Sequence, residues 1–160
     1  MVVAAVERVL DCAADSDRSI DAVARAWVGA RGGSLIIEEA VLPAGVFGRW
    51  LSMPGSDIVQ VGVGVVGRDR TIAHELGHMV LGHRGLPVTE YVEGLAQAAS
   101  PDLIAHMLQR ACCHEPTDES GAVQRDELAA EWFAGVLTRR VRGWQRRGRQ
   151  RSHNIDDAIG

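Results

Sequence analysis

The stretch TIAHELGHMVLGH, residues 71–83, decides the expected fold and the expected site. It places His74, Glu75 and His78 in the pattern H-E-x-x-H. On an α-helix, side chains four residues apart lie only about 40° apart around the axis, so both imidazoles project from one face and can bind one metal ion. Glu75 lies beside His74, in position to reach a water on that metal rather than the metal itself.

The same motif has a second interpretation, as polar residues on an exposed helix or as a hydrogen-bonded core histidine. H-E-x-x-H also occurs by chance in unrelated chains. Gly77 stands inside the motif, where the backbone entropy of glycine would weaken an exposed helix. A glycine is useful at this place if another element packs closely against it. The sequence therefore favours a buried, metal-binding helix.

Two histidines do not complete a catalytic zinc site, which usually takes three protein ligands and a water. His83 lies five residues after His78, about 140° around the helix, and should point away unless the helix has ended. The longer pattern H-E-x-x-H-x-x-G-x-x-H would need glycine at Leu81 and histidine at Arg84, so it does not apply. A third ligand from another element is therefore favoured over His83.

The better candidate is a carboxylate on a long helix expected over residues 122–141, which contains RDELAAEWFAGVL. Glu127 and Glu131 are four residues apart on one face, although either can instead be solvated. Ala130 and Ala134 continue that side, so two helices can approach closely enough for a carboxylate–zinc bond of about 2.0 to 2.2 Å. The buried remainder of this helix is expected to be Leu128, Trp132, Phe133, Val136 and Leu137.

These residues resemble the ImmA/IrrE-type zinc metallopeptidases, a gluzincin-like family. RTIAHELGHMVLGH, residues 70–83, is similar to the active-site helix of that family. ELAAEWFA, residues 127–134, fits its downstream pattern E-x-x-A-x-x-F-A. Residues 42–61 also resemble the strands that precede the motif in such proteins, and the resemblance covers about residues 19–140.

The resemblance implies a role for each motif residue. His74, His78 and Glu127 would bind Zn²⁺. Glu75 would be the catalytic base. The downstream pattern is degenerate, and it accommodates two other acidic residues in place of Glu127, namely Glu131 and Asp126. Candidate donors for the oxyanion lie between the two motifs, at Tyr91, His106 and His114.

The implied activity is that of a zinc-dependent endopeptidase that makes one regulatory cut in a partner protein, such as a helix-turn-helix repressor or an antitoxin. The alternative is a regulatory binding module that keeps the zincin fold without cutting. The chain itself has no recognition helix, because the helix expected at 20–31 is followed directly by a strand. A role in transcription would therefore need a partner protein.

We expect an α+β fold in a single domain over residues 1–160. A small, mostly antiparallel sheet should pack against the helices; the zincin-like motif helix carries the site, and the C-terminal helix supplies the third ligand. Ser19 and Asp69 are expected helix caps, and Pro54-Gly55 an expected hairpin turn. In chain order we expect helices at 2–14 and 20–31, strands at 34–42, 45–53 and 58–66, the motif helix, and helices at 102–113 and 122–141.

Composition limits the other classes of function. Only 4% of the 160 residues are aromatic, so Val, Leu, Ile and Ala must build the core. Three cysteines, with Cys112 and Cys113 adjacent, form neither a disulfide framework nor a zinc ribbon, and we assign them to packing. No apolar run is long enough to span a membrane. We therefore expect a cytoplasmic protein without a membrane partner.

The charge is distributed unevenly along the chain. The net charge is -4, yet RRVRGWQRRGRQR, residues 139–151, contains seven arginines and no acidic residue. This Arg-rich C-terminal extension could bind the phosphates of a nucleic acid. We favour a solvated helix end, or contact with the acidic remainder of the chain or an acidic protein, over nucleic acid binding.

Overall fold

The structure is a computed structural model that describes residues 1–13, 18–43, 45–83, 86–87 and 120–156. Over these ranges it is an α+β fold with four helices and a small sheet, which confirms the expected class. Some expectations fall outside the described residues: the helix at 102–113, Tyr91, His106, His114, Cys112 and Cys113.

The sheet is mixed, so the prediction of a mostly antiparallel sheet was wrong. Its four strands lie in the order β1-β3-β2-β4. The predicted hairpin is confirmed, because β2 and β3 pair antiparallel around Pro54-Gly55, with Gly55 at φ +75°. The pairs β1 with β3 and β2 with β4 are parallel. The strands are β1 Ser34–Ala40, β2 Gly48–Met53, β3 Ser56–Gly62 and β4 Leu86–Pro87.

The physical reason for this difference is the distance along the chain between paired strands. A hairpin is marked by a local turn signal such as Pro54-Gly55. The pairing of β1 with β3 joins Ser34 to Ser56 and has no such signal, because β2 is placed on the far side of β3. Strand β3 also ends at Gly62, earlier than expected, where the N–H of Val65 donates to the carbonyl of Gly62 in a turn.

The helix boundaries confirm one predicted cap and correct another. Ser19 caps α2, with its hydroxyl oxygen accepting from the N–H of Ala22 at 3.2 Å. Helix α3 begins after Gly67, which has φ +93°, so Asp69 lies within the first turn and is not the cap. There its carboxylate still suits the positive end of the helix dipole. The described helices are α1 Val2–Asp11, α2 Ile20–Gly29, α3 Arg68–Leu81 and α6 Ser120–Asp156.

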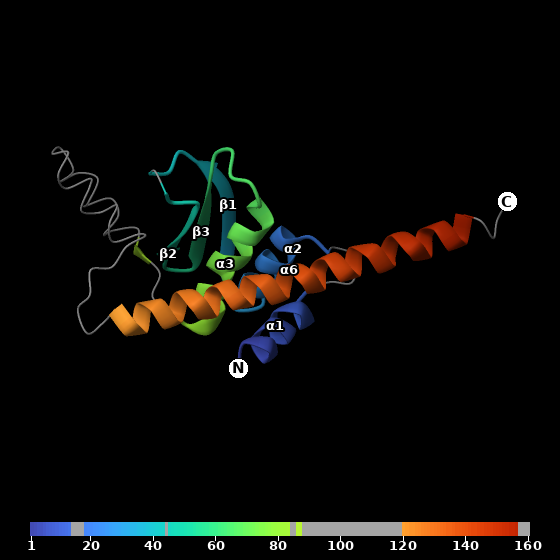
Figure 1. Cartoon of the computed structure of the whole chain (residues 1–160), viewed down its shortest axis with the longest axis horizontal. Coiled ribbons are helices and arrows are strands. Elements are labelled where there is room, and N and C mark those ends of the chain that lie inside the picture. The colour runs from blue at the N-terminus through green and yellow to red at the C-terminus, as the bar shows by residue number, and fades with distance from the viewer. Residues whose placement is uncertain (14–17, 44, 84–85, 88–119, 157–160) are drawn as a thin grey trace.

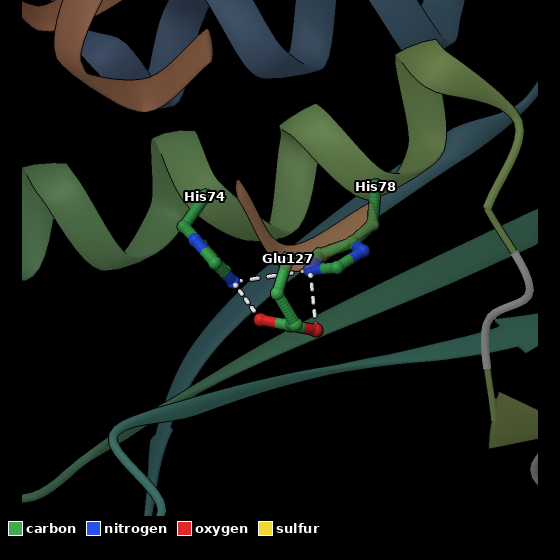
Figure 2. Close-up of side chains that lie close together, drawn as sticks. All are labelled: His74, His78 and Glu127. Carbon is green, nitrogen blue, oxygen red and sulfur yellow. Dashed lines mark hydrogen bonds and ion pairs between the residues drawn. The ribbon is translucent and has the colours of Figure 1, made fainter. Parts of the chain in front are cut away.

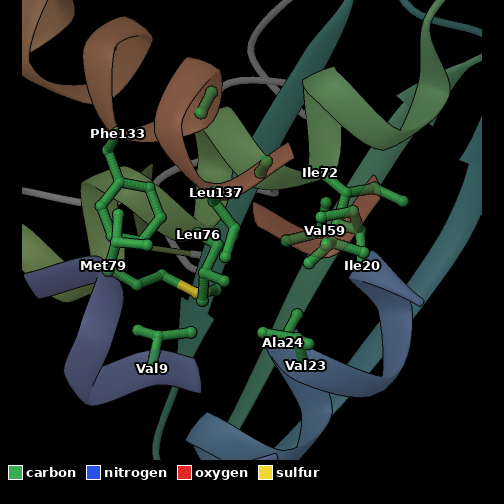
Figure 3. Packing of buried hydrophobic residues seen from close by; sticks show 14 of the residues in the cluster. Val9, Ile20, Val23, Ala24, Val59, Ile72, Leu76, Met79, Phe133 and Leu137 are labelled. Atoms are coloured by element: carbon green, nitrogen blue, oxygen red, sulfur yellow. The ribbon is translucent and has the colours of Figure 1, made fainter. Parts of the chain in front are cut away.

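Helices α2 and α3 pack against the sheet, and α6 crosses α3 on the side away from it (Figure 1). Helix α1 packs against α6 and also contacts α2 and α3 (Figure 1). Figure 3 shows Leu76 and Met79 of α3 close to Phe133 of α6, inside a cluster that also includes residues of α1, α2 and β3. The most extensive contact between helices is that of α3 with α6.

The buried side of α6 differs from the expected one at two residues. Leu128 and Trp132 are 65% and 58% exposed, so their predicted burial was wrong, whereas Phe133 and Leu137 are fully buried as predicted. The buried side runs along Ala130, Phe133, Ala134, Leu137 and Val141. Residues two positions from Ala130 lie about 160° around the helix from it, on the opposite face.

The first part of the Arg-rich segment packs on the body of the protein. Val141 is buried, and the guanidinium of Arg18 lies 5.6 Å from the centre of the Trp144 ring. Arg140 forms an ion pair with Glu7 at 2.7 Å. Farther on, α6 projects beyond the other elements (Figure 1). Among the described residues, no helix is both long and apolar enough to cross a membrane.

Helices α3 and α6 approach each other closely at Gly77, as the sequence predicted. A Cβ atom at this position would lie 3.2 Å from the Cα and the carbonyl oxygen of Ala130, and 3.2 Å from the ring of Phe133. These distances are shorter than ordinary van der Waals contacts, and two of them are to backbone atoms. The two helices can therefore lie at this separation only if position 77 has no side chain.

Replacing Gly77 with Leu should lower the free energy of unfolding by about 1–3 kcal/mol, because the added side chain must push α6 away from α3. Gly135→Ala is the matched control, since a Cβ at Gly135 on α6 would meet nothing within 4 Å. That control should raise stability by about 0.5–1 kcal/mol through helix propensity. Urea denaturation followed by circular dichroism measures both, and a Gly77→Leu protein as stable as wild type would contradict the close packing.

Candidate metal centre

Three side chains from two helices meet at one point on the surface of α3. His74 and His78 project from α3, and Glu127 reaches them from α6 (Figure 2). The Nε2 atoms of His74 and His78 are 3.0 Å apart. The two carboxylate oxygens of Glu127 lie 3.3 Å from Nε2 of His74 and 3.4 Å from Nε2 of His78. Within the described part of the chain, this group could hold a metal ion.

The spacing of these ligand atoms suits a small tetrahedral ion. Bonds of about 2.0 to 2.2 Å in a tetrahedral arrangement place neighbouring ligand atoms about 3.3 to 3.6 Å apart. The three observed separations lie between 3.0 and 3.4 Å, so an ion would fit after small side-chain movements. Two imidazoles and a carboxylate suit several first-row transition metals, and geometry alone does not select among them.

The contact between α3 and α6 explains why Glu127 reaches the histidines. Gly77 lies between the two histidines in the sequence and faces Ala130. Glu127 precedes Ala130 by about one helical turn, so the close approach at Gly77 carries its carboxylate over the histidine face. The close contact at Gly77, which the sequence predicted, therefore determines how near Glu127 comes to His74 and His78.

The other two acidic candidates lie beside the group and contact different nitrogens. Glu131 places a carboxylate oxygen 3.5 Å from Nδ1 of His74 and also forms an ion pair with Arg70. Asp126 contacts His83, with 3.4 Å between Oδ1 and Nε2. Of the three acidic residues, Glu127 is therefore the one whose carboxylate reaches both Nε2 atoms.

His83 turns back toward the group because α3 has ended. The helix stops at Leu81, and Gly82 adopts φ +76° as its left-handed cap. The backbone N–H of His83 donates to the carbonyl of His78 at 2.9 Å. As a result the Nδ1 atoms of the two rings lie 3.0 Å apart. His83 is a neighbour of the metal group through His78, and the sequence pattern suggested only that it could turn inward if the helix ended.

Glu75 is held in a tight, buried place between α3 and β2. Only 9% of the residue is exposed. A Cβ at Gly48 would overlap the methyl group of Thr71 and lie 3.0 Å from Oε1 of Glu75, so this strand can pass the carboxylate only with glycine there. The sequence analysis did not identify Gly48 as part of the site. The available signal was a glycine at the start of a strand, which often marks a close approach.

Burial raises the pKa of the Glu75 carboxyl to about 7, and the nearby charge of Glu127 acts in the same direction. The positive charge of His74 and a hydrogen bond from the backbone N–H of Trp50 oppose this shift. Loss of hydration disfavours the ionised form most strongly in a site that water barely reaches. The carboxyl can therefore accept and release a proton close to neutral pH.

The two histidines respond to the same surroundings in opposite ways. Burial tends to lower the pKa of His74, but its hydrogen bond with Glu127 and the charges of Glu75, Glu127 and Glu131 raise it overall. Burial lowers the pKa of His78 to about 4, aided by the positive charges of His74 and His83. The hydrogen bond from His74 lowers the pKa of Glu127. His78 is thus neutral at pH 7, as a metal ligand must be.

Comparisons with known proteins do not assign the chain to a family. No family model, curated protein or solved structure matches it. The site is therefore defined by its own residues and their geometry.

The pH dependence of stability in metal-free protein should report the buried carboxyl. Because the pKa of Glu75 rises from 4.5 to about 7 on folding, the folded state holds this proton more tightly than the unfolded chain. Its contribution to stability is complete below pH 4.5 and is lost as the pH rises through 7. Relative to Glu75→Gln, wild type should lose on the order of 3 kcal/mol across this range.

Urea denaturation of both proteins in the presence of a chelator, at several pH values between 4 and 8, measures this difference. ¹³C NMR of the Glu75 carboxyl provides a direct check, with a titration midpoint expected near pH 7. Parallel stability profiles for the two proteins, together with a midpoint near 4.5, would contradict the assigned burial of the carboxylate.

Proposed function

We propose that this protein is a zinc-dependent endopeptidase in which His74, His78 and Glu127 hold the metal and Glu75 is the general base. The observation that carries the proposal is the meeting of the three ligand atoms within 4.8 Å of one another, with a buried glutamate next to the first ligand. A structural metal site would not need this second carboxyl.

The donor set favours zinc among the metals that fit. Two imidazoles and one carboxylate are a common ligand set of catalytic zinc, and they leave a fourth position for water or substrate. When bound there, zinc would lower the pKa of a water molecule toward about 7 and polarise a carbonyl group. The negative charge of Glu127 offsets part of the charge of the ion.

Glu75 supplies the proton transfers. A pKa of about 7 allows its carboxylate to take a proton from the attacking water near neutral pH and to release it to the leaving amine. The hydrogen bond from the N–H of Trp50 and the close backbone of β2 at Gly48 restrict the orientation of the carboxylate. A fixed orientation helps because proton transfer requires the two heavy atoms to be within hydrogen-bonding distance.

The substrate that we propose is a regulatory protein, such as a helix-turn-helix repressor or an antitoxin, cut at one site. This proposal rests on the resemblance of residues 70–83 and 127–134 to the ImmA/IrrE-type family. The Arg-rich segment is not required for it. Trp144 is engaged by Arg18, so it is not a free platform for nucleic acid bases, and nucleic acid binding stays the less favoured role for this segment.

The second candidate is a regulatory binding module that does not cut its partner. One observation favours it: the contact between α3 and α6 is built on a buried apolar cluster that includes Leu76, Phe133 and Leu137. The two helices therefore have an apolar source of packing besides the candidate metal site. A module of this kind would exert its regulatory effect equally well without Glu75.

Zinc binding is the first test of the peptidase proposal against the binding module. Metal-free wild type should take up one zinc ion per chain, measured by elemental analysis after dialysis. His78→Ala and Glu127→Ala should each reduce the amount retained, because either change removes one ligand. Glu131→Ala is the matched control on the same helix and should retain the ion. Failure of wild type to bind zinc would remove the peptidase proposal and leave the binding module.

Cleavage is tested on zinc-loaded protein with a library of proteome-derived peptides, in which mass spectrometry detects new termini. Wild type should produce them, and Glu75→Gln should bind zinc but cut about 10²- to 10⁴-fold more slowly. New termini produced equally by both proteins would remove Glu75 as the base. Their absence from wild type with one zinc per chain would favour the binding module.

A further inference from the structure

His83 lies between a metal-ligand candidate and a carboxylate. Its Nδ1 is 3.0 Å from Nδ1 of His78, and its Nε2 is 3.4 Å from Oδ1 of Asp126. The side chain is only 11% exposed. Nothing in the proposed mechanism uses this residue, yet both of its ring nitrogens face a polar partner.

The positions of the protons follow from these contacts. A neutral imidazole carries one proton, so one of its nitrogens donates and the other accepts. If Nδ1 of His78 donates to Nδ1 of His83, then His83 must carry its own proton on Nε2, directed at Asp126. In this arrangement both contacts of His83 join a donor to an acceptor, and Nε2 of His78 keeps a free lone pair for a metal, on the side where Oε1 of Glu127 lies 3.4 Å away.

The reverse arrangement is unfavourable at His83 and blocks metal binding at His78. If neutral His83 donated from Nδ1, its Nε2 would present a lone pair to the carboxylate of Asp126, and the two would repel each other. His78 would then carry its proton on Nε2 and could not bind a metal through that atom. The negative charge of Asp126 therefore favours the arrangement that leaves Nε2 of His78 available, against the pull of Glu127 on a proton at that nitrogen.

The backbone places the ring of His83 beside His78. Gly82 caps α3 with φ +76°, and the N–H of His83 is bonded to the carbonyl of His78 at 2.9 Å. The ring therefore returns toward the same turn of α3 that carries His78. On the other ligand, Nδ1 of His74 faces Glu131 directly at 3.5 Å. Support for His78 differs in passing through a second imidazole.

We propose that His83 and Asp126 are positioning residues, which hold His78 with its proton on Nδ1 and its Nε2 directed at the metal. This inference rests on the proposed metal site and adds two residues that tune it. Partners of this kind are known to orient metal-binding histidines and to raise their basicity, and their loss typically weakens metal binding about 10- to 100-fold.

The first test is the zinc affinity of the full-length protein, measured by competition with a chromophoric chelator. His83→Phe keeps a planar ring but removes both nitrogens, and its dissociation constant should rise about 10- to 100-fold. His83→Asn offers a side-chain oxygen near the position of Nδ1 and should restore part of the affinity. Asp126→Ala should weaken binding less than His83→Phe.

Asp11→Ala is the control for loss of one negative charge, because Asp11 is an exposed carboxylate on α1. It should leave zinc affinity unchanged. Unfolding by urea checks that every variant is folded before affinities are compared. Equal zinc affinity of wild type and folded His83→Phe would overturn the inference, as would an equal loss in His83→Asn and His83→Phe.

The second test observes the proton itself in metal-free and zinc-loaded wild type. One-bond ¹⁵N–¹H coupling should place the proton on Nδ1 of His78, and a ¹⁵N–¹⁵N coupling across the hydrogen bond should join this atom to Nδ1 of His83. A proton on Nδ1 of His83 in zinc-loaded protein would overturn the inference. If wild type binds no zinc, the proposed function is wrong. If His83→Phe binds zinc as tightly as wild type, only the positioning role of His83 is wrong.

Discussion

The close packing of α3 on α6 at Gly77 is the constraint on which the rest of the structure depends. Backbone atoms of Ala130 lie only 3.2 Å from the position that a Cβ would take, so a side chain at Gly77 would push the two helices apart. This separation brings Glu127 to the two histidines of α3. It also buries Phe133 and Leu137 in the common core, so one contact serves both stability and the site.

At the candidate metal site, acidic side chains of α6 face histidines on α3 and just beyond its end. On α6, Asp126 contacts His83, and Glu127 contacts the Nε2 atoms of His74 and His78. Glu131 contacts Nδ1 of His74. Each acidic group therefore faces a different imidazole nitrogen. Arg70 binds Glu131 and limits the excess negative charge. Admission of a cation to this network would require the loss of a proton from the histidines that face Glu127.

Local patterns in the sequence predicted the parts of the fold that local signals determine. The spacing of His74 and His78, the glycine at 77, the Ser19 cap and the hairpin at Pro54-Gly55 each carry their signal within a few residues. Pairing of β1 with β3 and the outward position of Leu128 and Trp132 depend on which distant elements meet, so periodicity alone did not reveal them. The sequence left three acidic residues as candidates for the third ligand, and the position of α6 brings the carboxylate of Glu127, rather than those of Asp126 or Glu131, to the Nε2 atoms of both His74 and His78. Gly48 was missed because its role, making room for Glu75, exists only after β2 packs on α3.

The central claim is that one metal ion binds to side chains of both helices at this contact. X-ray absorption at the zinc edge of the zinc-loaded protein tests it most directly. The claim predicts only nitrogen and oxygen neighbours, at about 2.0 to 2.2 Å, with the outer-shell scattering of two imidazole rings. Sulfur neighbours at about 2.3 Å, or the scattering of a single imidazole, would contradict it, because zinc would then be bound by residues other than the group formed by His74, His78 and Glu127.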